Sequence, residues 1–195
     1  MKYHYSQTDF YTRRAKRENF PARSVYKLEE IDRKYGLFKS GDKVLDLGCA
    51  PGSWLLYLAQ KVGERGKVVG IDIVDLKIRL PQNVIFIKED VMKFEPKGNF
   101  QSVVSDLAAH TSGIKFRDVA QTLELCQRAL EIAKKALVKG GNFLCKVFEG
   151  EGTDDFFMEM KKNFEFIKRF KPKASRKQSK EMYIVAKGFL KNTLR

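Results

Sequence analysis

Residues 43–54 read K-V-L-D-L-G-C-A-P-G-S-W, and this stretch decides the fold. Apolar, strand-favouring residues lead into Asp46, and two glycines follow at Gly48 and Gly52. A helix-like run then begins at Ser53, which is suited to cap that helix. Gly48 allows a tight turn, and Gly52 allows a ligand to approach a backbone that has no Cβ. Strand, glycine turn and helix in this order predict a nucleotide-binding α/β domain.

The spacing of the glycines narrows the class of ligand. A dinucleotide site has G-x-G-x-x-G around a pyrophosphate, whereas this chain has D-x-G-x-x-x-G without the middle glycine. That difference favours a nucleoside ligand without a pyrophosphate, such as S-adenosylmethionine. The alternative is an ordinary strand-to-helix turn of an α/β protein, because short glycine motifs also occur by chance.

Four apolar stretches each deliver an aspartate where a predicted strand ends. These residues are Asp46, Asp72, Asp90 and Asp106. In an open parallel sheet such ends line the ligand crevice, where Asp72 is placed to accept ribose hydroxyls and Asp90 to accept the adenine amino group. An acidic crevice in a basic protein suits a ligand with positive charge. S-adenosylmethionine carries a sulfonium and an ammonium, so it fits this pattern.

The charge of the chain is large and concentrated at its ends. The formal net charge is +14 over 195 residues, a length that predicts a single domain. Residues 161–195 hold 12 lysines and arginines against two acids, and residues 1–43 hold 11 against six. Basic ends around a nearly neutral centre indicate a polyanion partner. A solvated lysine-rich surface is the alternative. We expect a basic helical extension at about residues 1–22.

Several classes of protein do not fit the sequence. No apolar run approaches the ~20 residues that span a bilayer, and the N-terminus lacks the apolar segment of a signal peptide. We therefore expect a cytoplasmic protein without a membrane partner. Cys49, Cys126 and Cys145 lie far apart, and the chain has two histidines. That spacing predicts neither a metal site nor a Cys-His nucleophile pair.

Lys146 lies in an apolar stretch, N-F-L-C-K-V-F at residues 142–148, that reads as a strand. A lysine inside a buried strand is rare unless it is paired, and burial disfavours its ammonium form, which suits a proton acceptor. The alternative is an edge-strand lysine that faces water. Lys27 lies beside the apolar stripe of a predicted helix at 24–35, where lysines usually extend into solvent. Glu181, in the last predicted strand, has no distinctive local context.

Five stretches together resemble the RrmJ/FtsJ family of ribose 2′-O-methyltransferases, which act on large-subunit ribosomal RNA. They are A-R-S-V-Y-K-L-E-E-I at 22–31, D-L-G-C-A-P-G-S-W at 46–54, S-D-L-A-A-H-T-S-G at 105–113, K-V-F-E-G-E-G at 146–152 and K-P-K-A-S-R-K-Q-S-K-E-M-Y-I-V-A at 171–186. The resemblance covers nearly the whole chain. It implies an α/β fold with a Rossmann-like class I sheet of seven strands, the last antiparallel, and helices on both faces, within one methyltransferase domain at 1–195.

The resemblance also implies a site and its partners. The implied catalytic tetrad is Lys27, Asp106, Lys146 as general base, and Glu181. The implied donor-binding residues are Asp46, Gly48, Gly52, Trp54, Asp72, Asp90 and Asp106, with Asp46 supporting the glycine loop. The implied donor is S-adenosyl-L-methionine, and the implied partner is ribosomal RNA within the large subunit, bound by a monomer. Two departures stand out: Ser53 replaces the second glycine of the family's P-G-G-W, and Ala108-Ala109-His110 lacks a proline common there.

Other functions stay open at this point. A transfer-RNA ribose methyltransferase would use identical chemistry, and a non-catalytic RNA-binding assembly factor could keep the same scaffold. Base methylation fits less well. Cytosine C5 chemistry needs a cysteine nucleophile, yet Cys49 lies in the glycine loop and Cys145 should point away from Lys146. Residues 105–108, S-D-L-A, lack the prolines of an adenine amino-methylation loop.

Overall fold

The computed structural model describes residues 7–108, 115–176 and 178–191. Its helices are α1 (Gln7–Arg17), α2 (Val25–Tyr35), α3 (Ser53–Val62), α4 (Lys115–Ala136) and α5 (Thr153–Lys161). Its strands are β1 (Lys43–Leu47), β2 (Lys67–Asp72), β3 (Val84–Lys88), β4 (Phe100–Ser105), β5 (Leu137–Phe148), β6 (Phe164–Phe170) and β7 (Glu181–Phe189). Among the described residues, no helix has the length and apolar character needed to cross a membrane.

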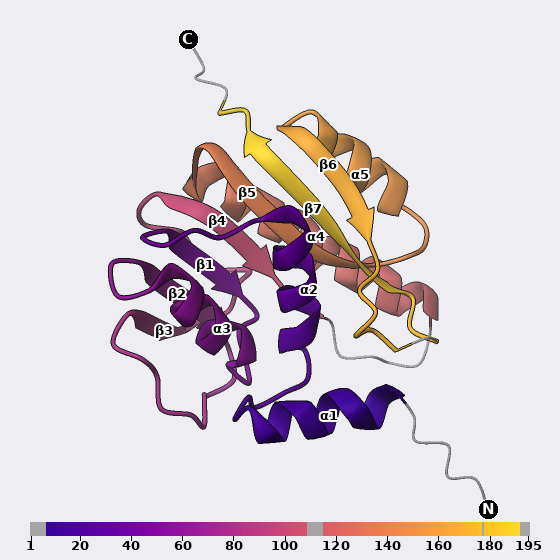
Figure 1. The fold of residues 1–195 in the computed structure, drawn as a ribbon. Helices are drawn as coiled ribbons and strands as arrows, with labels where there is room; N and C mark the ends of the chain where they lie inside the picture. The colour runs from indigo at the N-terminus through magenta and orange to yellow at the C-terminus, as the bar shows by residue number, and fades with distance from the viewer. Residues whose placement is uncertain (1–6, 109–114, 177, 192–195) are drawn as a thin grey trace, which may run out of the picture.

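The strands form one seven-stranded sheet in the order β3-β2-β1-β4-β5-β7-β6. The pairs from β3 to β5 are parallel, and β7 runs antiparallel to both of its neighbours, β5 and β6. Helices α2 and α3 cover one face of the sheet, and α4 and α5 cover the other (Figure 1). The predicted α/β sheet with an antiparallel last strand and helices on both faces is therefore confirmed.

The end of α4 differs from the prediction. The sequence pattern predicts a helix from Asp118 to Val138 that two glycines stop, but α4 runs from Lys115 to Ala136, and β5 already begins at Leu137. Leu137 pairs with Phe100 of β4, and the register then shifts. Gly140, with φ +78°, lies at this irregularity inside the strand. Leu137 and Val138 fit the helical pattern, but apolar residues of this kind also suit a strand. Pairing with β4 decides in favour of the strand.

Helix α2 is fixed to its neighbours through a buried carboxylate. Asp32 accepts hydrogen bonds from the N–H groups of Leu37 and Phe38 with one oxygen. Its other oxygen accepts from the Tyr57 hydroxyl at 2.8 Å and lies 3.0 Å from Lys61 Nζ, both on α3. Since buried polar groups need such partners, Asp32 sets the position of α2 and of Lys27, which α2 carries.

The start of α3 also differs from the prediction. Gly52, with φ +103°, occupies the cap position, and Ser53 is already the first helical residue. The Ser53 hydroxyl instead accepts a hydrogen bond of 2.7 Å from the backbone N–H of Ala22. The cap residue has a left-handed backbone conformation, which favours glycine. The cap is therefore Gly52, and not Ser53 as the sequence predicts. Ser53 thereby links the glycine loop to the segment that precedes α2.

Helix α1 lies across the N-terminal end of α2, at the end of the molecule toward which β1 and β4 point (Figure 1). Arg14 forms ion pairs with Glu18 and Glu29 and lies 4.2 Å above the ring of Tyr26. Tyr11 packs against the same ring at 5.6 Å. Part of the basic and aromatic character of α1 therefore serves its packing onto α2.

Candidate active site

The glycine loop turns sharply back against β2. Gly48 has φ +79°, and its N–H donates to the carbonyl of Ile71 at 2.9 Å. A Cβ added at Gly48 would lie 2.8 Å from the side chain of Leu107, and one at Gly52 would lie 2.3 Å from that of Ile78. Both positions favour glycine because of their positive φ, and an added Cβ at Gly48 would also lie 3.2 Å from the backbone Cα of Leu107. The predicted approach of a ligand to Gly52 stays a prediction, and in this structure the Ile78 side chain lies there.

Asp72, the last residue of β2, holds the glycine loop. One carboxylate oxygen accepts from the N–H of Ala50 at 2.8 Å, and the other accepts from the N–H of Val74 at 2.9 Å. Each oxygen has a second lone pair available to a ligand hydroxyl. The predicted contact of Asp72 with ribose hydroxyls stays a prediction.

Asp46 lies in β1 directly before the loop and is fully buried. Neither of its carboxylate oxygens has a hydrogen-bond partner among the described residues. Burial, followed by the nearby charges of Asp106 and Asp72, raises the pKa of Asp46 well above its usual range. Among the described residues, Asp72 and not Asp46 accepts a hydrogen bond from the glycine loop, so the expected support of the loop by Asp46 stays a prediction. A buried carboxyl without a partner is rare and costly, so this position calls for a cation or donor from outside.

Asp90 lies two residues beyond β3. Its Oδ1 accepts from the N–H of Met92 at 2.9 Å, and its backbone carbonyl accepts from Lys93 and Phe94. A contact with an adenine amino group stays a prediction. Within the described part of the chain, Asp46, Asp72 and Asp90 form no ion pair. The carboxyl groups at the ends of β1 to β3 thus have no side-chain cation beside them within the described residues.

Lys146 and Asp106 meet where β4 and β5 end. Lys146 Nζ lies 3.1 Å from Asp106 Oδ1 and donates to the Asp106 backbone carbonyl at 2.6 Å. Only 7% of the Lys146 side chain is exposed, against 19% for Asp106. The alternative of a solvent-facing edge lysine is thereby excluded, because β5 lies between β4 and β7.

Lys27 and Glu181 form the second ion pair of the site. Lys27 Nζ lies 2.7 Å from Oε1 and 2.8 Å from Oε2 of Glu181, and the two side chains are 15% and 12% exposed. The Ser175 hydroxyl donates to Glu181 Oε1 at 3.0 Å, and the Glu181 N–H donates to the Ser179 hydroxyl. The position of Lys27 beside the apolar stripe suggests a side chain that extends into solvent. The structure instead pairs Lys27 with Glu181.

Tyr183 connects the two ion pairs. Its hydroxyl donates to Asp106 Oδ1 at 2.8 Å, and its ring centroid lies 5.9 Å from Lys27 Nζ. Burial, together with the charges of Asp106 and Glu181, raises its pKa, so the hydroxyl stays protonated and acts as a donor. The sequence analysis missed Tyr183, although its spacing of two from Glu181 on a strand places both residues on the same face.

Trp54, predicted to bind the donor, lies buried at the start of α3. Its indole N–H donates to the carbonyl of Ser24 at 3.0 Å, and its ring lies 6.0 Å from that of Tyr183. Trp54 thus fixes the start of α2 beside the tetrad residue Lys27. Its contact with a donor stays a prediction. Ala109 and His110, in the departure from the family pattern, lie outside the described residues.

The thiols lie in the core. Cys49, Cys126 and Cys145 are all buried, and burial raises the pKa of Cys145 well above its usual range. A buried thiol that keeps its proton is a poor nucleophile, which weakens the base-methylation alternative. In the part of the chain that the structure describes, no group of three or more His, Cys, Asp or Glu residues is arranged to hold a metal ion.

Known proteins resemble this chain over most of its length. The model of the FtsJ-like methyltransferase family matches residues 20–189. The large-subunit ribosomal RNA methyltransferase E of Nitratidesulfovibrio vulgaris is 44% identical over 189 residues, which cover 93% of each chain. The protein of the same name from Lawsonia intracellularis is 45% identical over 193 residues, 95% of this chain and 96% of its own.

Solved structures agree on the fold. A crystal structure from Plasmodium falciparum, described as a ribosomal RNA methyltransferase, has a TM-score of 0.78 at 27% identity and covers 88% of this chain and 99% of its own. A fibrillarin/Nop5p complex has a TM-score of 0.61 at 19% identity, covers 85% of this chain and 83% of its own, and shares the fold alone.

The site fits the donor that such methyltransferases use. The uncompensated carboxyl of Asp46 suits a ligand that carries positive charge, and the Asp72 carboxylate keeps acceptor capacity for hydroxyls. S-adenosylmethionine has both kinds of group. On the match of the family model and on these relatives, the chain belongs to the FtsJ-like methyltransferase family, and S-adenosylmethionine is its methyl donor.

Proposed function

We propose that this chain methylates the 2′-hydroxyl of a ribose in large-subunit ribosomal RNA. The names of its relatives, at 44–45% identity over more than nine-tenths of the chain, supply the substrate class. The position of Lys146 supports the proposed chemistry. A nearly buried lysine, Lys146, is held by the carboxylate and by the carbonyl of the same residue, Asp106. Such a lysine has the features of a general base rather than of a surface contact.

The donor would lie at the ends of β1 to β4. When bound, S-adenosylmethionine supplies an electrophilic methyl group on its sulfonium. The carboxyl of Asp46, which lacks a partner, would balance a cationic group of the donor. Asp72 would accept from the ribose hydroxyls, and Asp90 from the adenine amino group.

Lys146 would remove the proton of the attacking hydroxyl. A ribose hydroxyl is a weak nucleophile, so a positioned base accelerates its attack on the methyl group. In its deprotonated form the lysine amine has two N–H groups and one lone pair. Lys146 Nζ donates to the Asp106 carbonyl and lies 3.1 Å from Asp106 Oδ1, so both N–H groups can face Asp106 while the lone pair faces the hydroxyl proton. Tyr183 holds the same carboxylate and so fixes the direction of the lysine.

Lys27 would act on the acceptor. Both oxygens of Glu181 lie within hydrogen-bonding distance of its Nζ and hold it in place. A third N–H remains for a phosphate of the RNA or for the oxygen on which negative charge develops. Holding the hydroxyl and the methyl in line supplies much of the remaining acceleration.

We infer that a monomer in the cytoplasm acts on RNA within the large subunit, and that side chains handle the proton and the charge without a metal ion. The basic segment 161–195 and the basic helix α1 supply positive charge for a large folded polyanion.

Methyl transfer from labelled S-adenosylmethionine tests the proposal. Isolated large subunits, free ribosomal RNA and transfer RNA serve as parallel acceptors, with Lys146→Ala beside the wild type. The exposed-lysine variant Lys67→Ala is the control. Label in alkali-resistant ribose of the large subunit, lost only in Lys146→Ala, is the expected result. Label only in transfer RNA would mean that transfer RNA, and not ribosomal RNA, is the substrate. Donor binding without any methyl transfer would favour a non-catalytic assembly factor.

A further inference from the structure

A groove lies at the end of α2 opposite to the tetrad. It has a volume of about 550 Å³ and lies between the C-terminal end of α2 and the strands β5, β6 and β7. Its lining includes Lys34, Tyr35, Lys39, Glu165, Phe166 and Lys187. Three lysines and two aromatic rings around one acid form an unusual lining for a structural crevice. This combination is typical of sites that bind single-stranded nucleic acid.

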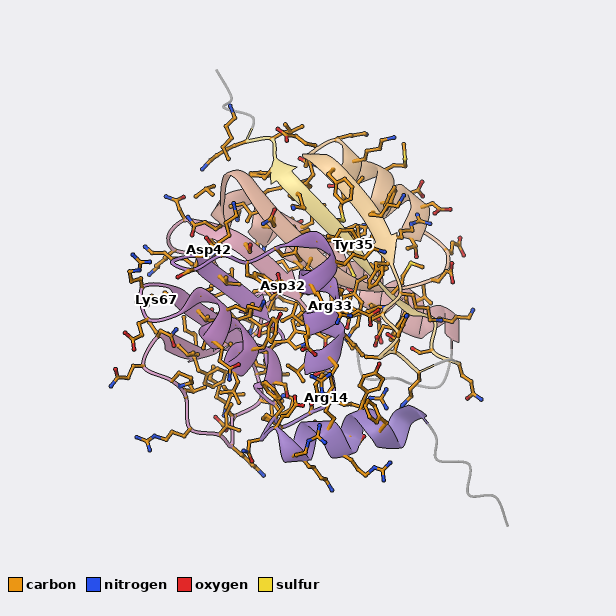
Figure 2. The ribbon with its side chains drawn as sticks, viewed as in Figure 1. Arg14, Asp32, Arg33, Tyr35, Asp42 and Lys67 are labelled. Atoms are coloured by element: carbon orange, nitrogen blue, oxygen red, sulfur yellow. The ribbon has the colours of Figure 1, made fainter. Side chains whose placement is uncertain are left out.

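The aromatic residues of the groove are arranged as an open stacking surface. Phe166 on the edge strand β6 is 41% exposed. Tyr35 lies at the end of α2, on the side of β6 (Figure 2). Its ring centroid lies 6.1 Å from that of Phe166. Lys34 Nζ lies 4.4 Å from the ring centroid of Phe170, which is the next aromatic residue on the same face of β6. A nucleobase on Phe166 would thus have a cation close to its phosphate.

The charge of the groove is available to a ligand. Lys34 and Lys39 form no ion pair within the described residues, and Lys187 donates to the carbonyl of Tyr35 at 2.6 Å. A second groove, of about 410 Å³, lies near β1 to β3 and contrasts with this one. Its lysines are accompanied by Glu89 and Glu95, and its aromatic side chains are buried.

The groove and the tetrad lie along the same face of α2. Lys27 and Lys34 are seven residues apart on α2, so they lie on one face of the helix and about 10 Å apart along its axis. Phe170 of β6 pairs in register with Tyr183 of β7, which lies in the site. An axial distance of about 10 Å corresponds to roughly three stacked nucleotides at 3.4 Å each. One RNA strand can therefore reach both places.

We propose that this groove binds an unstacked nucleotide, with its phosphate, from the same RNA strand whose ribose is methylated. Phe166 stacks on the base, and Lys34 and Lys39 contact the phosphate. The inference rests on the proposed methylation of RNA and adds a second contact a few nucleotides from the reacting ribose.

Binding of a 12-nucleotide oligouridine, measured by fluorescence anisotropy at fixed salt, tests the groove. Phe166→Ala should weaken binding about fivefold or more, since stacking contributes about 1–3 kcal/mol per base. The matched control is Ile85→Ala, because Ile85 is 42% exposed on the opposite edge strand β3 and should leave binding unchanged. Lys34→Glu should lower the affinity for the oligonucleotide and reduce the salt dependence of that affinity. Lys67→Glu changes an exposed lysine outside the groove and should have a smaller effect on both quantities.

Phe166→Tyr separates stacking from packing, because it retains the ring. Binding by Phe166→Tyr close to that of wild type, with thermal midpoints alike, supports the groove. Equal losses in Phe166→Ala and Phe166→Tyr, or wild-type affinity in Phe166→Ala and Lys34→Glu, overturn it. Methyl transfer to large subunits is measured in the same series. If the wild type binds the oligonucleotide through Phe166 but transfers no methyl group, the proposed reaction is refuted, whereas RNA binding by the groove is still supported.

Discussion

The two halves of the site differ in how their charges are balanced. At the ends of β1 to β3, Asp46 has no partner, and the carboxylates of Asp72 and Asp90 accept only from backbone N–H groups, within the described residues. On α2, β5 and β7, every catalytic charge is paired: Lys146 with Asp106, and Lys27 with Glu181. We refer to these as the donor half and the acceptor half.

This difference indicates which half is preorganised. In the acceptor half, the side chains already hold one another at hydrogen-bonding distance, so little reorganisation is required when the hydroxyl arrives. In the donor half, the buried carboxyl of Asp46 lacks a partner, and a ligand that supplies a cation or a donor would remove an energetic penalty. Donor binding should therefore stabilise the fold, whereas the acceptor half should be nearly unaffected by it.

The largest expected effect comes from the acceptor half. Lys146→Ala should lower the rate of methyl transfer by about 10²- to 10⁴-fold, the range typical of a lost general base. Donor affinity by calorimetry should stay at the wild-type value, because Lys146 is not among the residues expected to bind the donor. Full activity in a folded Lys146→Ala protein would end its assignment as the base.

Asp46→Asn is the corresponding change in the donor half. It should weaken S-adenosylmethionine binding about tenfold to a hundredfold, since a hydrogen bond to a charged group contributes about 1.5–3 kcal/mol. Calorimetry measures the affinity, and the exposed Asp75→Asn is the control. Wild-type affinity in Asp46→Asn would show that the uncompensated charge is not part of the donor site.

The same variant should be more stable without donor. The pKa of Asp46 is raised in the folded protein, against about 3.9 in the unfolded chain. Stability is therefore lost as the pH rises from about 3.9 through the folded pKa. The neutral amide of the variant avoids that loss, so Asp46→Asn should raise the free energy of unfolding by roughly 1–3 kcal/mol at pH 8 and by less at pH 4. Urea titrations at the two pH values measure this difference, and a pH-independent difference would contradict it.

Glu181→Gln tests whether the acceptor half depends on pairing. The change keeps the shape but removes the charge that binds Lys27, so kcat/KM should fall about tenfold, equivalent to about 1.4 kcal/mol. The exposed Glu64→Gln serves as the control. If Glu181→Gln weakened donor binding as much as Asp46→Asn, the two halves would not be separate.

The donor half could be predicted largely from local sequence, and the acceptor half could not. The glycines and the strand-terminal aspartates are a local pattern, because consecutive parallel strands bring their ends together. Lys27 and Glu181 are 154 residues apart, and nothing in either neighbourhood indicates the other. Only the resemblance to a known family joined them. Tyr183 was missed because a buried tyrosine on a strand has no distinctive local pattern, and nothing local indicates that Asp72 accepts a hydrogen bond from the glycine loop.

The smallest effect is expected at Ser53, where the two halves meet. The Ser53 hydroxyl accepts from the N–H of Ala22, which precedes α2 and Lys27. Ser53→Ala keeps the Cβ and the helix but leaves a partly buried N–H unpaired, so the free energy of unfolding should fall by about 0.5–1.5 kcal/mol. Ser40→Ala, at an exposed serine, should be neutral in the same urea titration. Because the link joins preformed halves rather than forming either one, donor affinity should not change. A Ser53→Ala protein with weakened donor binding would mean that α2 helps to shape the glycine loop, and that the donor half depends on the acceptor half.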